Sequence, residues 1–137
     1  MQKTSLINGF ALALILATGV LAASTVGSRA AQATPPAAES HVASPDVYRV
    51  LAENEALRVI EAAWQPGQED AFHSHPANRI TIYQTACELE VTGADGATRT
   101  GRPKAGTARI VSGKAVASHK VRNAGSKACR IWMVEMK

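Results

Sequence analysis

The sequence has 137 residues, of which 46% are hydrophobic and 19% are charged, and its formal net charge at pH 7 is +4. Without the leader that its first residues predict, about one hundred residues remain, which are enough for one small domain with a single core but not for two. Its charges are interspersed, as in Lys120-Val121-Arg122, and it has no run of basic residues with interleaved aromatic residues. The sequence therefore offers little support for nucleic-acid binding.

The first residues have the pattern of an export signal. Lys3 is followed by a charge-free, mostly apolar segment from Phe10 to Ala23, which is short for a membrane span of about 20 residues. The small residues Ala31-Gln32-Ala33 fit a cleavage site best, with Val20-Leu21-Ala22 as the alternative. We therefore predict a signal peptide over residues 1–33 and a periplasmic or secreted protein with no membrane segment after cleavage. The alternative is an uncleaved membrane anchor.

A linker is predicted between this leader and the folded domain. Residues 34–45 are rich in Pro, Ala and Ser and lack hydrophobic periodicity, which predicts a flexible, disordered tether. His41 lies within it and is expected to be solvated. Lys3 and Arg29 would leave with the leader, so thirteen basic and eleven acidic residues would give the remaining chain a net charge of +2.

Residues 46–137 are predicted to form one domain of short strands. Runs rich in Val, Ile and Thr alternate with turn residues, and no long segment with a period of 3.6 follows the leader. Many short strands without crossover helices predict an all-β sandwich or small barrel, whose inward side chains line a mouth suited to a small-molecule ligand. The expected strands are Val47–Leu51, Ala56–Trp64, Phe72–His75, Arg79–Thr85, Cys87–Val91, Thr98–Arg102, Ala108–Ser112, Ala117–Arg122 and Lys127–Glu135.

Two of the connections between these strands have clear turn signals. In Gln65-Pro66-Gly67 the proline fixes one dihedral angle and the glycine accepts a positive φ. Gly93-Ala94-Asp95-Gly96 predicts a hairpin in which Asp-Gly supplies two residues with positive φ.

His73 and His75 are the sharpest chemical signal in the sequence. Residues two apart on a strand project to the same side, so both imidazoles are expected to face one way. His119 lies in another predicted strand, and three converging imidazoles can bind a divalent metal ion. The sequence therefore predicts a metal site at these three residues. The alternative is a strand end with solvated histidines.

The segment from Gly67 to His75 resembles the first motif of the cupin superfamily, which is a glycine, five residues and His-x-His. His119 and Asn123 match the histidine and the asparagine of the second motif, and the resemblance covers residues 46–137. It implies a double-stranded β-helix, or jelly roll, whose histidines point into the barrel. It also implies a bound divalent metal ion, namely zinc, manganese, iron, copper or nickel.

Three positions depart from these motifs. The metal-binding glutamate of the first motif should follow His75 after three or four residues, where this sequence has Arg79 and Ile80. Ala86 occupies the region of the glycine that often ends the first motif, and Lys114-Ala115-Val116 replaces the Pro-x-Gly of the second. The resemblance therefore implies the fold more strongly than it implies the metal.

Arg79 has two readings that the sequence leaves open. Pointing inward, it would oppose a dication and favour a ligand with a carboxylate or phosphate group. Pointing outward, it would be a solvated residue at the start of a strand. Thr81 and Tyr83 share its strand parity, so all three face the barrel or none does. Arg79 and Tyr83 are the candidate ligand-binding residues.

Two further pairs are expected to be structural. Cys87 and Cys129 lie in predicted strands, and two buried free thiols are favoured over a disulfide, because cysteine is commonly a small core residue. A disulfide would need Cα atoms within about 7 Å, which a sequence does not establish. Glu69 and Asp70 are interpreted as a solvated turn, since neighbours on an extended chain face apart.

These patterns lead to competing functions. The leading one is an exported single-domain cupin that binds a divalent metal ion, with any catalysis centred on that metal. Whether it is an enzyme stays open; the resemblance suggests an oxidoreductase or isomerase. The alternative is a non-enzymatic module that binds a small anionic ligand in the barrel. A third function is an interaction domain, for example a homodimer that pairs edge strands.

Overall fold

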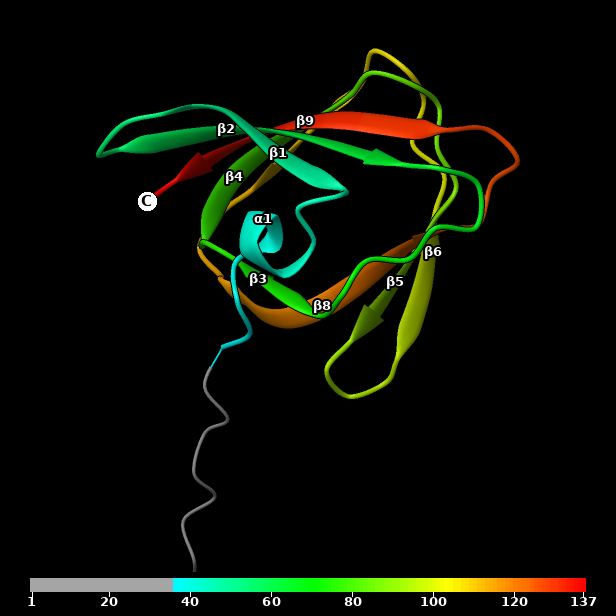
Figure 1. Ribbon diagram of the computed structural model, residues 1–137, viewed down its shortest axis with the longest axis horizontal. Coiled ribbons are helices and arrows are strands. Elements are labelled where there is room, and N and C mark those ends of the chain that lie inside the picture. Colours follow the sequence, from blue (N-terminus) through cyan, green and yellow to red (C-terminus); the bar gives the residue numbers. More distant parts are fainter. Residues whose placement is uncertain (1–35) are drawn as a thin grey trace, which may run out of the picture. The chain divides into compact units, whose positions relative to one another are not determined.

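The computed structural model describes residues 36–137, so the predicted signal peptide and residues 34–35 lie outside the described part of the chain. Within that part, nine strands form two antiparallel sheets, and this confirms the predicted jelly roll (Figure 1). The elements are α1 (Ser40–Ala43), β1 (Tyr48–Glu53), β2 (Leu57–Trp64), β3 (His73–His75), β4 (Asn78–Tyr83), β5 (Leu89–Gly93), β6 (Thr98–Gly101), β7 (Ala108–Val111), β8 (Val116–Asn123) and β9 (Cys129–Met136).

Strands from distant parts of the sequence are neighbours in both sheets. The five-stranded sheet has the order β1-β2-β9-β4-β7, and the four-stranded sheet has the order β3-β8-β5-β6. β2 pairs along its whole length with β9, from Leu57 opposite Met136 to Trp64 opposite Cys129. Figure 1 shows the two sheets curving around a common interior. The histidine-bearing strands β3 and β8 therefore face β9 across the barrel.

The barrel interior is apolar at one end and charged at the other. Alternate residues of β2 and β9 are buried because successive side chains of a strand point to opposite faces. Towards one end these inward positions hold Trp64, Ala62, Cys129 and Ile131, and each large apolar side chain stabilises the fold by about 1.5–3 kcal/mol. Towards the other end the same faces carry Arg58 and Glu135, both buried.

Residues 36–45 pack against the barrel, so for this segment the predicted flexible tether was wrong. The Ala37 amide donates to the Ala117 carbonyl (2.9 Å), and the Ser74 amide donates to the Ala38 carbonyl (2.8 Å). The segment then enters α1, which contacts β1 and β3, an edge strand of each sheet (Figure 1). Composition did not reveal this packing, because its first hydrogen bonds are made by backbone groups, which any residue supplies.

Cys87 and Cys129 form a disulfide, so the expectation of two free thiols was wrong. Their Cα atoms are 5.1 Å apart. Cys87 precedes β5 of the four-stranded sheet, whereas Cys129 begins β9 of the five-stranded sheet. The bond therefore ties the two sheets together at the apolar end of the barrel.

The two predicted turns are present, with one difference. Gly67 has φ 77° and Gly96 has φ 78°, as their turns require. Asp95 does not share this conformation, because every positive φ in the described part of the chain belongs to a glycine. Its carboxylate instead accepts a hydrogen bond from the Ala97 amide at 3.0 Å.

Candidate metal centre

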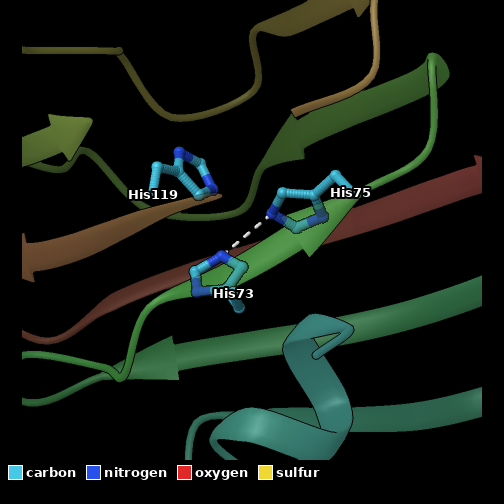
Figure 2. Close-up of side chains that lie close together, drawn as sticks. All are labelled: His73, His75 and His119. Carbon is cyan, nitrogen blue, oxygen red and sulfur yellow. Dashed lines mark hydrogen bonds between the residues drawn. The ribbon is translucent and has the colours of Figure 1, made fainter. Parts of the chain in front are cut away.

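His73, His75 and His119 come together inside the barrel. β3 carries the first two, and β8 places His119 directly opposite His73 in the strand register. A ladder irregularity between His73 and His75 accompanies the short β3. One ring nitrogen of each residue lies within 4.8 Å of the other two, and the three rings surround a common point (Figure 2). The predicted convergence of the imidazoles is therefore present.

Hydrogen bonds at Nδ1 fix the orientation of two of the rings. His73 Nδ1 lies 2.8 Å from the Ala71 carbonyl, and His75 Nδ1 lies 2.6 Å from the Glu135 carboxylate. Both partners are acceptors, so each Nδ1 carries the proton and each Nε2 of a neutral ring keeps its lone pair. The two Nε2 atoms face each other at 3.0 Å. Two lone pairs at that distance repel unless a cation lies between them.

The third ring has a nitrogen that is also free to bind a cation. His119 Nε2 is buried and has no hydrogen-bond partner among residues 36–137. Tetrahedral zinc holds its ligands at 2.0–2.1 Å, which places neighbouring ligand atoms about 3.3 Å apart. The 3.0 Å between the Nε2 atoms of His73 and His75 is close to this value. The three side chains thus fit a metal ion as its ligands, with further coordination positions for water or an oxygen-bearing molecule.

Protonation is a poor substitute for a metal ion in this cluster. Burial, followed by the neighbouring His73 and the cation Arg79, lowers the pKa of His75 to about 2. Burial and the other two histidines lower the pKa of His119 to about 3. Both rings are therefore neutral near pH 7, which is the form that binds a metal ion.

Asp70 is part of a buried network behind His73, so the interpretation of Asp70 as a solvated turn residue was wrong. Its carboxylate accepts hydrogen bonds from the Tyr48 hydroxyl (2.7 Å), the Trp64 indole (3.1 Å) and the Val121 amide (2.6 Å). Burial raises the pKa of the Asp70 carboxyl, and these donors oppose that shift. The Tyr48 hydroxyl is also 3.2 Å from His73 Nε2. The network therefore fixes the position of the His73 ring.

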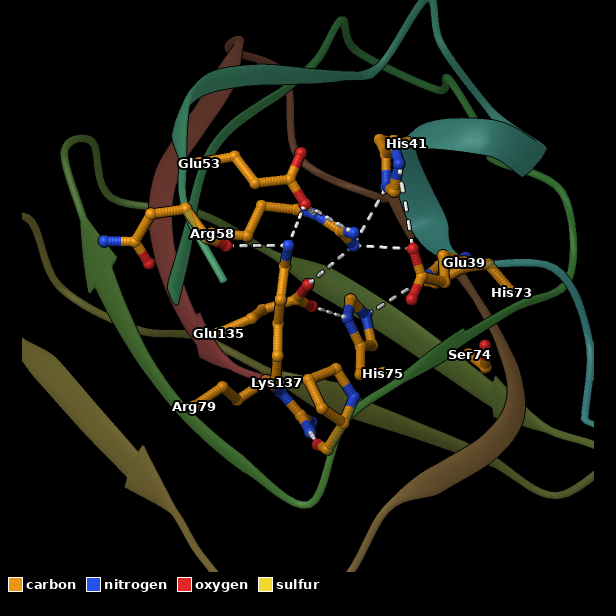
Figure 3. Close-up of polar contacts among 12 residues, drawn as sticks. Glu39, His41, Glu53, Arg58, His73, Ser74, His75, Arg79, Glu135 and Lys137 are labelled. Atoms are coloured by element: carbon orange, nitrogen blue, oxygen red, sulfur yellow. Dashed lines mark hydrogen bonds and ion pairs between the residues drawn. The ribbon is translucent and has the colours of Figure 1, made fainter. Parts of the chain in front are cut away.

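Glu135 forms a second network on the other side of the cluster. It is 2% exposed and accepts the Nδ1 proton of His75. Arg58 lies 3.7 Å from Glu135 and reaches Glu39 at 2.6 Å, so the contacts run from His75 to the segment before α1 (Figure 3). A carboxylate behind a ligating histidine orients the ring and makes it a better donor. Sequence reasoning missed Glu135 and Arg58, although each lies on the same face of its strand as residues of the hydrophobic core.

Arg79 faces the barrel interior. It lies opposite Glu135 in the register of β4 and β9, and Thr81 on the same face is buried. Its guanidinium is 3.4 Å from the Pro76 carbonyl. Tyr83, four residues further along β4, packs against the core and lies opposite Ile131. Of the two orientations considered for Arg79, the structure has the inward one. Ligand binding by Arg79 and Tyr83 stays a prediction.

Asn123, the other residue of the second motif, has a structural role. Its side-chain amide donates to the carbonyls of Trp64 (3.2 Å) and Lys127 (2.8 Å), and its side-chain oxygen accepts from the Gly125 amide (3.0 Å). These contacts hold the turn between β8 and β9.

A groove beside His75 gives a small molecule room to approach the cluster. Its volume is about 440 Å³. It runs between the segment before α1 and the first residues of β8. The lining residues are Pro36, Glu39, Ser74, His75, Pro76, Ala115, Val116 and Ala117.

Comparison with solved structures shows that the chain has the cupin jelly-roll fold. A cupin domain from Bordetella pertussis Tohama I is 22% identical with a TM-score of 0.59, and the match covers 66% of this chain and 92% of that one. A double-stranded β-helix protein from Klebsiella pneumoniae is 25% identical (TM-score 0.50, 66% and 75% covered), and a Bacillus halodurans protein is 17% identical (TM-score 0.51, 66% and 69% covered). No protein-family model and no curated protein matches the sequence.

Proposed function

We propose that this chain is an exported cupin that binds a divalent metal ion through His73, His75 and His119. One observation carries the proposal: three imidazoles converge inside the barrel while the Nδ1 atoms of His73 and His75 are occupied by acceptors, which leaves their Nε2 atoms directed at one another. A metal ion bound there would polarise an oxygen-bearing molecule or activate water. The groove beside His75 supports a small-molecule ligand.

The donor set favours some metals over others. All three proposed ligands are imidazole nitrogens, which suit zinc, copper, iron and nickel. Manganese prefers carboxylate and other oxygen ligands, and the glutamate that would supply one in the first motif is absent. We therefore expect zinc, copper, nickel or iron to bind more tightly than manganese.

Elemental analysis of protein purified without an affinity tag tests the metal site. We expect about one equivalent of metal per chain, and a rise in melting temperature when metal is returned to the stripped protein. His119→Ala should lose both effects. His41 is not solvated as expected but contacts Arg58 and Glu39; because it touches no ring of the cluster, His41→Asn should keep both effects. Stripped protein whose stability is unchanged by Zn²⁺, Mn²⁺, Cu²⁺, Ni²⁺ and Fe²⁺ would contradict the proposal.

The second candidate function is binding of a small anion, with or without a metal ion. The inward position of Arg79 favours it, because a guanidinium in a half-buried site pairs with carboxylate and phosphate groups. Succinate and phosphate are suitable probes in calorimetry. Arg79→Glu should abolish their binding and strengthen metal binding. Equal anion affinities of the unchanged protein and the Arg79→Glu variant would show that Arg79 does not bind the anion.

Export is supported by the leader-like sequence and by the disulfide. Disulfides form in oxidising compartments, among them the periplasm and the exterior of the cell. None of the helices within residues 36–137 is long and apolar enough to cross a membrane. Expression of the full-length chain followed by fractionation and mass spectrometry tests export: the expected product is outside the cytoplasm and begins at Thr34. A cytoplasmic product that keeps the leader would contradict it.

A further inference from the structure

The outward faces of the two sheets differ in chemistry. The four-stranded sheet presents polar residues to solvent, among them Glu90 and Thr92 of β5, paired with Arg122 and Lys120 of β8. Such a polar exterior is typical of an antiparallel sheet with one solvated face. The five-stranded sheet instead presents an apolar exterior, which we call the outer apolar face. It consists of Ala52, Leu57, Val59, Ile80, Ile82, Ala108, Ile110, Trp132, Val134 and Met136.

An unbroken aliphatic row crosses this face. In the strand register, Ala52 lies opposite Val59, Val59 opposite Val134, Val134 opposite Ile80, and Ile80 opposite Ile110. Directly opposed residues share a face, so the row runs over all five strands. Apolar residues at outward-facing positions of five adjacent strands are unexpected for a surface that faces only water.

The charge at the border of the face is largely paired within the chain. Glu61 lies next to Trp132 in the register, and it pairs with Arg49 at 2.7 Å and with Arg130 at 3.7 Å. Two arginines against one glutamate leave a net charge of +1 at this border, which is little for a strongly charged partner such as a nucleic acid or an anionic membrane. An apolar centre with a polar border is the usual arrangement of a protein–protein interface.

The two ends of the aliphatic row have complementary shapes. At the β7 end, Ile110 is 74% exposed and projects from the sheet. At the β1–β2 end there is a hollow of about 180 Å³, lined by Ala52, Leu57 and Val59 together with Glu53 and Asn54. The projection and the hollow lie in the same row, at opposite edges of one sheet.

We propose that the outer apolar face binds the same face of a second copy of this chain, about a two-fold axis parallel to the strands. Rotation about such an axis places β7 of each copy over β1 and β2 of the other. Because Ile110 and the hollow share one row, each Ile110 then enters the hollow of the partner, twice per dimer. This is the self-complementary contact that a two-fold interface requires. Two sheets stacked in this way pack about 10 Å apart.

The size of the face agrees with this partner. Five strands spaced about 4.8 Å apart, over five residues rising about 3.3 Å each, cover on the order of 400 Å². This area lies within the range of about 300–600 Å² found for the largest apolar patch of a protein, and such a patch is often functional. A standard interface buries about 800 Å² per partner, of which the apolar part is the centre and the polar rim the remainder. The proposal is independent of the metal site and differs from the pairing of edge strands.

Light scattering and sedimentation of the protein purified from full-length expression test the dimer. We expect a dimer for the unchanged protein and at least a tenfold weaker association for Ile110→Lys. Val42→Lys is the matched control, because Val42 is 63% exposed but lies on α1, away from the face. A monomer at all concentrations would overturn the proposal, and so would equal effects of the two substitutions. Binding to neutral lipid vesicles by a monomer would identify a membrane as the occupant instead.

A charge exchange tests the two-fold arrangement itself. Ala52→Asp should also weaken the dimer, because it places a carboxylate in the hollow. Mixing the A52D and I110K proteins should restore a heterodimer, since one of its two contacts becomes an ion pair and the other is unchanged. The double variant should form a homodimer with two ion pairs. A failure of both to associate, with folding verified by circular dichroism, would exclude this axis.

Discussion

Glu135 and His75 are 60 residues apart in sequence, and the Glu135 carboxylate accepts the Nδ1 proton of His75 at 2.6 Å. The carboxylate that the first motif lacks at position 79 is thus present behind a ligand rather than beside it. Glu135→Gln should lower metal affinity about 10- to 100-fold, because the neutral amide is a weaker acceptor and no longer offsets the charge of the ion. Competition with a coloured chelator measures this change.

A matched control separates this effect from a general loss of charge. Glu90→Gln removes a carboxylate that pairs with Arg122 on the polar exterior of the barrel, and we expect its metal affinity to be unchanged. Equal affinities for the unchanged protein and E135Q would mean that the contact does not support metal binding.

Asp70 should be important for stability even when no metal is bound. Its carboxylate accepts three buried hydrogen bonds, and Asp70→Asn would direct amide hydrogens towards at least one of these donors. We expect a loss of about 2–3 kcal/mol in the free energy of unfolding, measured by urea denaturation of metal-free protein. The neighbouring substitution Glu69→Gln removes only a surface pair with Lys120 and should change stability by less than about 1 kcal/mol. Similar losses in both variants would contradict this account.

The disulfide should contribute much of the stability of this small barrel. It joins cysteines 42 positions apart, and closing a loop of that length is worth about 4 kcal/mol on the chain-entropy model. Replacing both Cys87 and Cys129 with alanine should therefore lower the denaturation midpoint strongly. Adding a reductant to the unchanged protein should have the same effect, and a reductant that also destabilises the double variant would point to another cause.

The stability of the metal-free protein should fall as the pH decreases from 7. His75 and His119 have folded pKa values of about 2 and about 3, whereas in the unfolded chain each titrates near 6.5. Their contribution is thus fully present above pH 6.5 and is lost as the pH falls towards the folded values, by roughly 1 kcal/mol per pH unit for each residue. The raised pKa values of Asp70 and Glu135 act in the opposite direction at lower pH.

Comparison with His119→Asn isolates the histidine contribution. Urea denaturation between pH 7 and pH 5, in the presence of a chelator, should give a shallower pH dependence for H119N than for the unchanged protein. The same slope in both would mean that His119 is not buried in its neutral form.

Local sequence patterns were sufficient to predict the strands and the three histidines. The alternation of apolar residues located all nine strands, and the spacing of His73 and His75 predicted their common direction correctly. Contacts between residues that are distant in the sequence were harder to predict. The distance between Cys87 and Cys129 depends on how the two sheets stack. The burial of Asp70 depends on its contacts with Tyr48 and Trp64, whereas the propensity of a short segment to form a turn depends only on neighbouring residues.

The parity of Glu135 along β9 is a sequence signal for the buried network behind His75. In β9 the inward positions are Cys129, Ile131, Met133 and Glu135, and a carboxylate on that parity is a charge directed at the core. Charged groups seldom occupy such positions without a partner, so this residue by itself indicates a polar network in the interior. Arg58 on the inward face of β2 carries the same signal.

The position of β9 also determines when the histidine cluster can assemble. β9 lies between β2 and β4, so neither strand has both of its neighbours until residues 129–136 have joined the sheet. Until then the edges of β2 and β4 are unpaired, and unpaired edges of this kind promote aggregation. Pairing over such sequence separations is slow. The ring of His75 therefore gains its Glu135 partner only when β9 joins the sheet.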